Sequence, residues 1–265
     1  MGRGVDTVLA FNTQAGVGAF PIVLAPAAGD SLTVRASKGE ARARLMAAIT
    51  GGTAGSKYRI QSPLLHDNVT GLTFAPFEMP AAFTVPPDTS VELQQQDTLT
   101  VSGSCTGATT ITMGLVIDYD DLRGTSADLY RWSDIGPDIK YLKSVEVDLA
   151  AIAVGAWTDT LVNATEDQLH ADRSYAVLGY ASAQAIDIIG IKGVATGNLR
   201  MCGPGPGTTI DITEYFVMMA ERHGRPYIPV FQANDRKAFN VSAANHAAVA
   251  AGIVSLLVAE LKTKR

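Results

Sequence analysis

The sequence predicts an all-β protein made of two tandem jelly-roll (β-sandwich) units, with one short helix inserted in the second. Three observations predict this class. Short strand patterns recur about every ten residues between turn-forming residues, as in sandwiches and jelly rolls. The second half of the chain repeats the first in outline. The length of 265 residues suits one large all-β domain or two domains of about 130 residues each.

The internal repeat consists of three short echoes that keep their order along the chain. Residues 31–35 (SLTVR) are echoed by 144–148 (SVEVD), and residues 57–60 (KYRI) by 174–177 (SYAV). Residues 100–102 with the run to Tyr119 are echoed by 240–242 with the run to Leu261. The offset grows from 113 to 117 to 140, as insertions in a duplicated unit would make it grow. We therefore expect a first jelly roll over residues 1–122, a polar linker over 123–140 and a second jelly roll over 141–265.

In the first half, strand patterns alternate with turn residues. The clearest one places Leu32, Val34 and Ala36 on one face of a half-buried strand. Residues 44–50 lead into a glycine-rich connection over 51–55. Prolines at positions 76, 80, 86 and 87 separate several of the others. Further strands are expected over 20–24, 57–62, 71–75, 82–85, 91–94, 99–102 and 109–119.

The second half opens with residues 141–152, where Val145 and Val147 alternate with Glu146 and Asp148. Further strands are expected over 157–162, 174–182, 186–192, 227–231 and 238–242. The final run, 243–261, is open to two interpretations, because its alanines favour a helix while its alignment with 109–119 favours a long buried strand. We expect a strand over its latter part.

One helix is expected over residues 211–223. Asp211 is placed to cap it, and Glu214 to complete a reciprocal capping box. Gly224 and Pro226 then end the helix. Its buried stripe is expected to consist of Ile212, Phe216 and Met219.

Composition excludes several classes of protein. Hydrophobic residues make up 47% of the chain and charged residues 18%, which is ordinary for a folded domain, and the net charge of −5 argues against a duplex-coating protein. Cys105 and Cys202 do not make a disulfide framework; one bridge between them is open, but two small buried hydrophobes are expected. No secretory signal is visible, and the most apolar run, 247–259, is short for a membrane helix. We expect synthesis in the cytosol.

No catalytic, cofactor-binding or metal-ligating residues are expected, and the chain is predicted not to be an enzyme. The four histidines (His66, His170, His223 and His246) are scattered singly, and His223 is expected to act as a cation at the end of the helix. The glycine runs at 51–57 and 203–207 lack the spacing of phosphate loops. Asp118, Asp120 and Asp121 could bind calcium, but a solvated linker entrance is favoured.

In its arrangement the chain resembles the double jelly-roll major capsid proteins of tailless icosahedral viruses. The resemblance is carried by the strand pair at Ser31 and Ser144, by the pair at Val101 and Val241 with the apolar strands after them, and by the helix 211–223 before the last strands. The first half has no clear counterpart of that helix; residues 89–96 could supply one turn of it. The resemblance extends over nearly the whole chain and is one of architecture.

The resemblance implies a homotrimer whose six jelly rolls form a pseudo-hexagonal block in a capsid shell. The protein would then be made in the host cytoplasm and located in the virion, with vertex or minor capsid proteins as further partners. The alanine-rich region 243–251 would be a subunit contact. The termini would face the interior, where Arg3, Lys262, Lys264 and Arg265 could make a weak contact with an internal membrane or the genome.

Two alternatives remain. A carbohydrate-binding or adhesive β-sandwich, such as a tail, spike or surface module, would use exposed aromatic side chains, for which Trp132 and Trp157 are available. A metal-dependent enzyme of the two-domain cupin type is disfavoured, because the sequence has no His-x-His pair.

Overall fold

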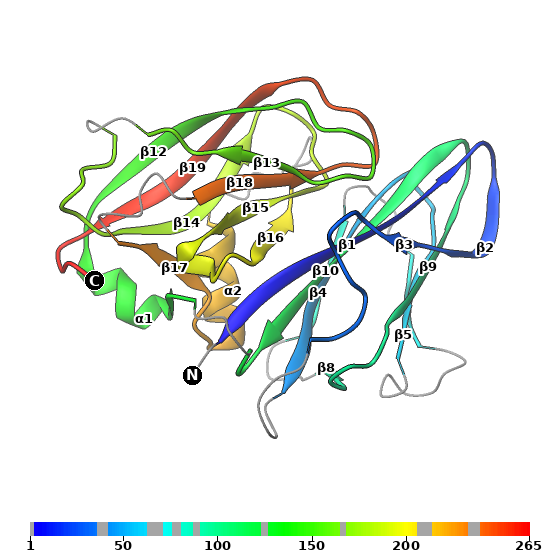
Figure 1. Ribbon diagram of the computed structural model, residues 1–265, viewed down its shortest axis with the longest axis horizontal. Coiled ribbons are helices and arrows are strands. Elements are labelled where there is room, and N and C mark those ends of the chain that lie inside the picture. The colour runs from blue at the N-terminus through cyan, green and yellow to red at the C-terminus, as the bar shows by residue number, and fades with distance from the viewer. Residues whose placement is uncertain are drawn as a thin grey trace.

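The computed structural model of the chain describes residues 3–35, 42–62, 71–75, 81–86, 91–122, 127–164, 168–205, 214–232 and 239–265. These residues form two antiparallel β-sandwiches that lie side by side (Figure 1). The predicted all-β fold with two tandem jelly rolls is confirmed by the order of their strands.

In the first sandwich, one sheet has the order β3-β1-β10-β4-β7, with β8 also paired to β4, and the other has the order β2-β9-β5-β6. If the two-residue strand β3 is set aside and β7 and β8 are counted as one position, strands 1, 8, 3 and 6 along the chain face strands 2, 7, 4 and 5. This order is that of a jelly roll. The bounds are β1 (Gly4–Gln14), β2 (Gly18–Val23), β3 (Ala25–Pro26), β4 (Ala43–Gly51), β5 (Tyr58–Gln61), β6 (Leu72–Phe74), β7 (Ala81–Thr84), β8 (Val91–Leu93), β9 (Thr100–Cys105) and β10 (Thr109–Tyr119).

The second sandwich repeats this topology. Its sheets have the orders β11-β17-β14-β19-β12 and β13-β18-β15-β16, so that strands 1, 8, 3 and 6 again face strands 2, 7, 4 and 5 once the short β11 is set aside. The bounds are β11 (Leu129–Tyr130), β12 (Ile139–Leu149), β13 (Thr158–Leu161), β14 (Tyr175–Ser182), β15 (Ile188–Gly193), β16 (Arg200–Pro204), β17 (Ile228–Phe231), β18 (Phe239–Ala244) and β19 (Gly252–Leu261).

The shared strand order corrects the internal repeat. The last echo is confirmed, because residues 100–102 and 240–242 lie in the equivalent strands β9 and β18, and β10 and β19 follow them. The first two echoes are wrong. Residues 31–35 contain only an isolated bridge between Thr33 and Thr98, whereas 144–148 lie in β12, whose counterpart is β1. Residues 57–60 lead into β5, the fourth strand, while 174–177 lead into β14, the third.

Strand β1 is the counterpart of β12, and it was not predicted from the sequence. Seven consecutive residues, from Gly4 to Ala10, are buried, because both faces of the β1-β10-β4 sheet are covered. A strand that is covered on both faces lacks the alternation of apolar and polar residues by which a strand is recognised in a sequence. The C-terminal strand β19, by contrast, lies where the latter part of 243–261 was predicted to be a strand.

The second jelly roll provides one of the two covers. Its edge strand β16 lies against the outer face of the first jelly roll and contacts β1, β10, β4 and β7. One apolar cluster joins the interior of the second jelly roll to outer-face residues of the first, among them Val5, Leu9, Ile49 and Val116. We call this contact the seam; its apolar continuity makes the two sandwiches one packed body.

Two glycines allow the close approach at the seam. A Cβ atom added to Gly114 in β10 would lie 2.7 Å from Cδ1 of Ile188, and one added to Gly51 in β4 would lie 1.8 Å from a carboxylate oxygen of Asp187. Both neighbours belong to the second jelly roll. Any larger side chain at these positions would push the two sandwiches apart.

Helix α2 (Tyr215–His223) lies between strands β16 and β17, the fifth and sixth strands of the second jelly roll. Phe216 and Met219 are buried and Gly224 ends the helix with a positive φ of 58°, as predicted. The predicted capping box is wrong at Glu214, which is the N-cap itself and makes no side-chain cap bond. Asp211 and Ile212 lie outside the described residues.

The segment between the last strand of the first jelly roll and the first strand of the second is structured where it is described. It contains β11, a one-turn helix α1 (Trp132–Ile135) and a 3-10 turn (Gly136–Asp138). Strand β11 pairs with β17, and Ile135 is buried in the core of the second jelly roll. No helix in the described part of the chain is long and apolar enough to cross a membrane.

Candidate interaction surfaces and the seam

The seam buries several charged side chains, each paired across it. Asp118 at the end of β10 is fully buried and is bound by Arg3 at 2.8 Å and by Arg225, which follows α2. Asp30 accepts hydrogen bonds from Arg200 of β16 at 3.3 Å and from the indole Nε1 of Trp157 at 2.7 Å. Because each carboxylate of the first jelly roll meets a donor of the second, the seam is specific in position as well as apolar.

Asp118, Asp120 and Asp121 were predicted to lie at a solvated linker entrance, with calcium binding as the alternative. For Asp118 the structure shows a buried ion-pair site instead. Burial acts to raise the pKa of Asp120, but a 2.8 Å hydrogen bond from Arg44 and the charges of Arg44, Arg225 and Arg3 lower it overall. Within the described residues, no group of three or more metal-ligating side chains comes together.

A histidine–carboxylate pair lies at the same seam. Nδ1 of His246 is 2.8 Å from Oδ2 of Asp187, and the backbone N–H of His246 donates to that same oxygen at 2.7 Å. Thr112 of β10 donates to Asp187 from the first jelly roll at 3.2 Å. The hydrogen bond and charge of Asp187 raise the pKa of His246, against the opposing effect of burial. No signal in the sequence pointed to this pair, since its members are far apart along the chain.

The other predicted single residues fall into different environments. Burial, with the charges of Arg222 and Arg225, lowers the pKa of His223, which disfavours the cationic form that was predicted at the helix end. Cys105 and Cys202 are both buried free thiols and form no disulfide with each other. His66 lies outside the described residues.

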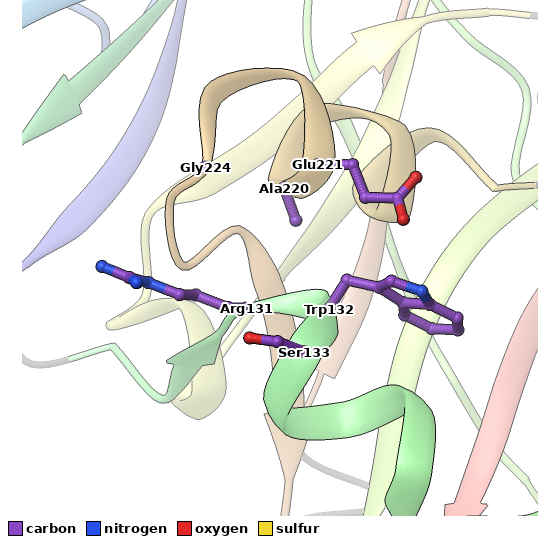
Figure 2. Close-up of a pocket in the computed structure, with 6 residues that line it drawn as sticks. All are labelled: Arg131, Trp132, Ser133, Ala220, Glu221 and Gly224. Carbon is purple, nitrogen blue, oxygen red and sulfur yellow. The ribbon is translucent and has the colours of Figure 1, made fainter.

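Trp157 is not available as a binding platform. Its ring lies under the guanidinium of Arg200 at 4.9 Å, and its indole N–H is bound to Asp30. Trp132 lies instead beside an open groove of about 440 Å³ between α1 and α2 (Figure 2). Arg131, Trp132 and Ser133 form one side, and Ala220, Glu221 and Gly224 form the other.

Several large apolar side chains of the second jelly roll are exposed, as are Val17 and Val23 of the first. Tyr141 and Leu142 on β12 are 57% and 60% exposed, Leu161 on β13 is 57% exposed, and Ile253 on β19 is 44% exposed. Strand β12 is the edge of its sheet, and its side of the molecule points away from the first jelly roll (Figure 1). These residues are candidates for contact with another protein surface.

The predicted subunit contact at 243–251 is partly wrong. Ala243 and Ala244 are fully buried in β18 and cannot touch a neighbour. The alanines that are exposed follow them in the connection to β19, at positions 247, 248, 250 and 251.

The two termini lie at one end of the molecule, on either side of α1 (Figure 1). Most of the basic groups predicted there are engaged within the protein. Arg3 is bound to Asp118, Lys262 donates to the carbonyl of Pro137, and Arg265 is bound to Asp138. The side chain of Lys264 is exposed.

The strand order defines the fold class of the protein: two tandem jelly rolls, with a helix between the fifth and sixth strands of the second unit. No protein-family model, curated protein or solved structure matches the chain. The assignment of a function therefore depends on the strand order and on the surfaces described above.

Proposed function

We propose that this protein is a capsid subunit that self-assembles, as trimers, into the shell of a tailless icosahedral virus. The observation that carries the proposal is the fusion of two jelly rolls of identical strand order into one body across an apolar, ion-paired seam. A rigid two-sandwich block is suited to close packing in a shell, because sheets hold its shape while loops at the strand ends are free to vary.

Two further features support it. The helix α2 lies between the fifth and sixth strands of the second jelly roll, where it supports the resemblance to double jelly-roll capsid proteins. The location of both termini at one end gives the subunit a polarity, so that one end can face the interior of a shell and the other the outside (Figure 1). On this proposal the protein is made in the host cytoplasm, is located in the virion, and contacts vertex or minor capsid proteins. Its termini make at most a weak contact with an internal membrane or the genome, because Arg3, Lys262 and Arg265 are bound within the protein.

Electron microscopy of the expressed full chain tests the proposal. Negatively stained preparations should contain three-fold blocks, alone or joined into sheets or closed shells. A field of single subunits that never associates, across a range of protein and salt concentrations, would reject it.

A carbohydrate-binding or adhesive role is the second candidate, and one observation favours it. The groove beside Trp132 combines an aromatic ring with the charged side chains of Arg131 and Glu221, which is the mixture that sugar-binding sites use (Figure 2). A glycan array with clear hits that are lost in Trp132→Ala, together with a monomeric chain in solution, would support this role in place of the first.

A further inference from the structure

We propose that the outer face of the β12-β19-β14 sheet is the surface that receives a second copy of this chain, and that the first jelly roll of that copy docks on it edge first. This inference depends on the proposed assembly and names the contact that builds it. The starting point is the seam, where the second jelly roll docks edge first on the equivalent face of the first.

The two faces are equivalent by strand order. In the first jelly roll the occupied face belongs to β1, β10 and β4, and in the second the corresponding strands are β12, β19 and β14. Among the residues that the structure describes, only one of these two equivalent faces is covered by the other jelly roll. The other points away from the seam (Figure 1).

The register identifies the residues of the unoccupied face. Ser255 of β19 lies opposite Glu146 of β12 and Ala181 of β14, so the three side chains share one face. The next row toward one end pairs Ile253 with Asp148, and the next row toward the other end places Leu257 between Ser144 and Gly179. Leu142 is on the same face of β12, two residues before Ser144.

This face shares small and apolar side chains with the occupied one, although it also carries the carboxylates Glu146 and Asp148. Its centre carries small side chains, Ser255, Ala181 and Gly179, and the occupied face likewise carries Gly114 in β10 and Gly51 at the end of β4, which admit Ile188 and Asp187. An apolar residue of this face, Ile253, is 44% exposed, whereas Val116 of the occupied face is fully buried under the second jelly roll. The difference is what an occupied and an unoccupied copy of one docking face would show.

Charge indicates which part of the second copy docks there. Two copies of this face laid against each other would bring Glu146 and Asp148 of one chain close to the same carboxylates of the other, which is unfavourable. The contact is therefore head to tail. The edge that corresponds to β16 in the first jelly roll is β6, the edge strand of its sheet. A head-to-tail contact that closes on itself forms a ring, and three chains place six jelly rolls around it.

The first test places a bulky side chain in the centre of the face. Ser255→Trp should weaken the contact between chains. The concentration at which the oligomer dissociates, measured by light scattering, should rise about tenfold or more. The matched control is Val17→Trp, at an exposed turn between β1 and β2, which should leave that concentration unchanged. Circular dichroism confirms that both variants remain folded.

The second test detects the contact directly. Ser255→Cys combined with Thr73→Cys, at the centre of β6, should yield chains linked by disulfides on oxidation, while neither single variant should do so. Cys105 and Cys202 do not interfere, because both are buried.

The outcomes separate the inference from the proposed function. A wild-type chain that is monomeric at every concentration rejects both. If the wild type is trimeric and Ser255→Trp does not change its dissociation, the assembly is supported but the head-to-tail contact on this face is rejected. Disulfide-linked chains in the Ser255→Cys single variant would reject the contact in the same way.

Discussion

At the scale of single residues, the structure shows that side chains scattered along the sequence form hydrogen bonds between the two jelly rolls. Asp187 is buried at the seam, where it accepts hydrogen bonds from Thr112 of one jelly roll and from His246 of the other. The pair therefore links the two sandwiches through an imidazole whose pKa Asp187 raises.

The first prediction concerns pH. Because Asp187 raises the pKa of His246, the charged pair stabilises the fold fully below the ordinary histidine pKa of 6.5, and this contribution is lost as pH rises through the raised value. His246→Gln should therefore lower the free energy of unfolding by about 1–2 kcal/mol at pH 5.5 and by much less at pH 8.5. Urea titrations at the two pH values measure the difference. An equal loss at both would contradict the assigned role of the pair.

The second prediction concerns the glycine that faces Ile188. Gly114→Val should destabilise the protein by about 1–3 kcal/mol, because its Cβ would press on Ile188 across the seam. Gly107→Ala, at a turn with open space around it, is the control and should change stability by less than about 0.5 kcal/mol. Thermal unfolding measures both. A Gly114→Val variant as stable as the control would show that the sandwiches do not approach so closely.

At the scale of elements, α2 closes one side of the second jelly roll with aromatic side chains. Phe216 is fully buried and lies 5.9 Å from Tyr180 and 5.6 Å from Tyr215, measured between ring centroids. Burial of these tyrosines raises the pKa of each well above that of an exposed tyrosine.

Phe216→Ala should accordingly cost about 3–5 kcal/mol of stability, since it leaves a cavity among packed rings. Met218→Ala, on the exposed side of the same helix, should cost less than about 1 kcal/mol. Chemical denaturation of the two variants gives the comparison. Similar losses for both would mean that the helix does not seal the sandwich.

How far the sequence predicted these elements depends on how each strand is covered. Strand β10 was predicted with its observed bounds, and β19 as a strand, because each is long and markedly apolar. The helix end at Gly224 was predicted because a glycine in the left-handed conformation is a local signal. Strand β1 was missed because it is covered on both faces, and this shifted the first repeat echo onto residues 31–35, which form only a bridge.

The interaction surfaces could be predicted less well than the fold. Two jelly rolls and a helix follow from local patterns, whereas the seam depends on which face of one sandwich receives the edge of the other. The carboxylates Asp118 and Asp120 illustrate this, because their partner Arg225 is more than one hundred positions away in sequence. A run of acidic residues beside a linker gives no sign of such a partner.

At the scale of the whole molecule, the seam makes the two jelly rolls interdependent. Arg225→Met should destabilise the protein by about 2–4 kcal/mol, because it removes one of the two guanidinium partners of a fully buried carboxylate. Arg222→Met, at an exposed position near the end of α2, serves as the control and should have little effect. Calorimetry of the variants should also show whether both sandwiches unfold in one transition, as a shared core requires.

The central claim is that this rigid pair of sandwiches is a building block that associates with copies of itself. The most direct test is the mass of the purified full chain, measured by light scattering during size-exclusion chromatography at micromolar concentration. A trimeric building block requires a particle of three times the chain mass of 27.8 kDa, or larger assemblies made of such particles. A single peak at the mass of one chain, unchanged as the concentration is raised, would contradict it.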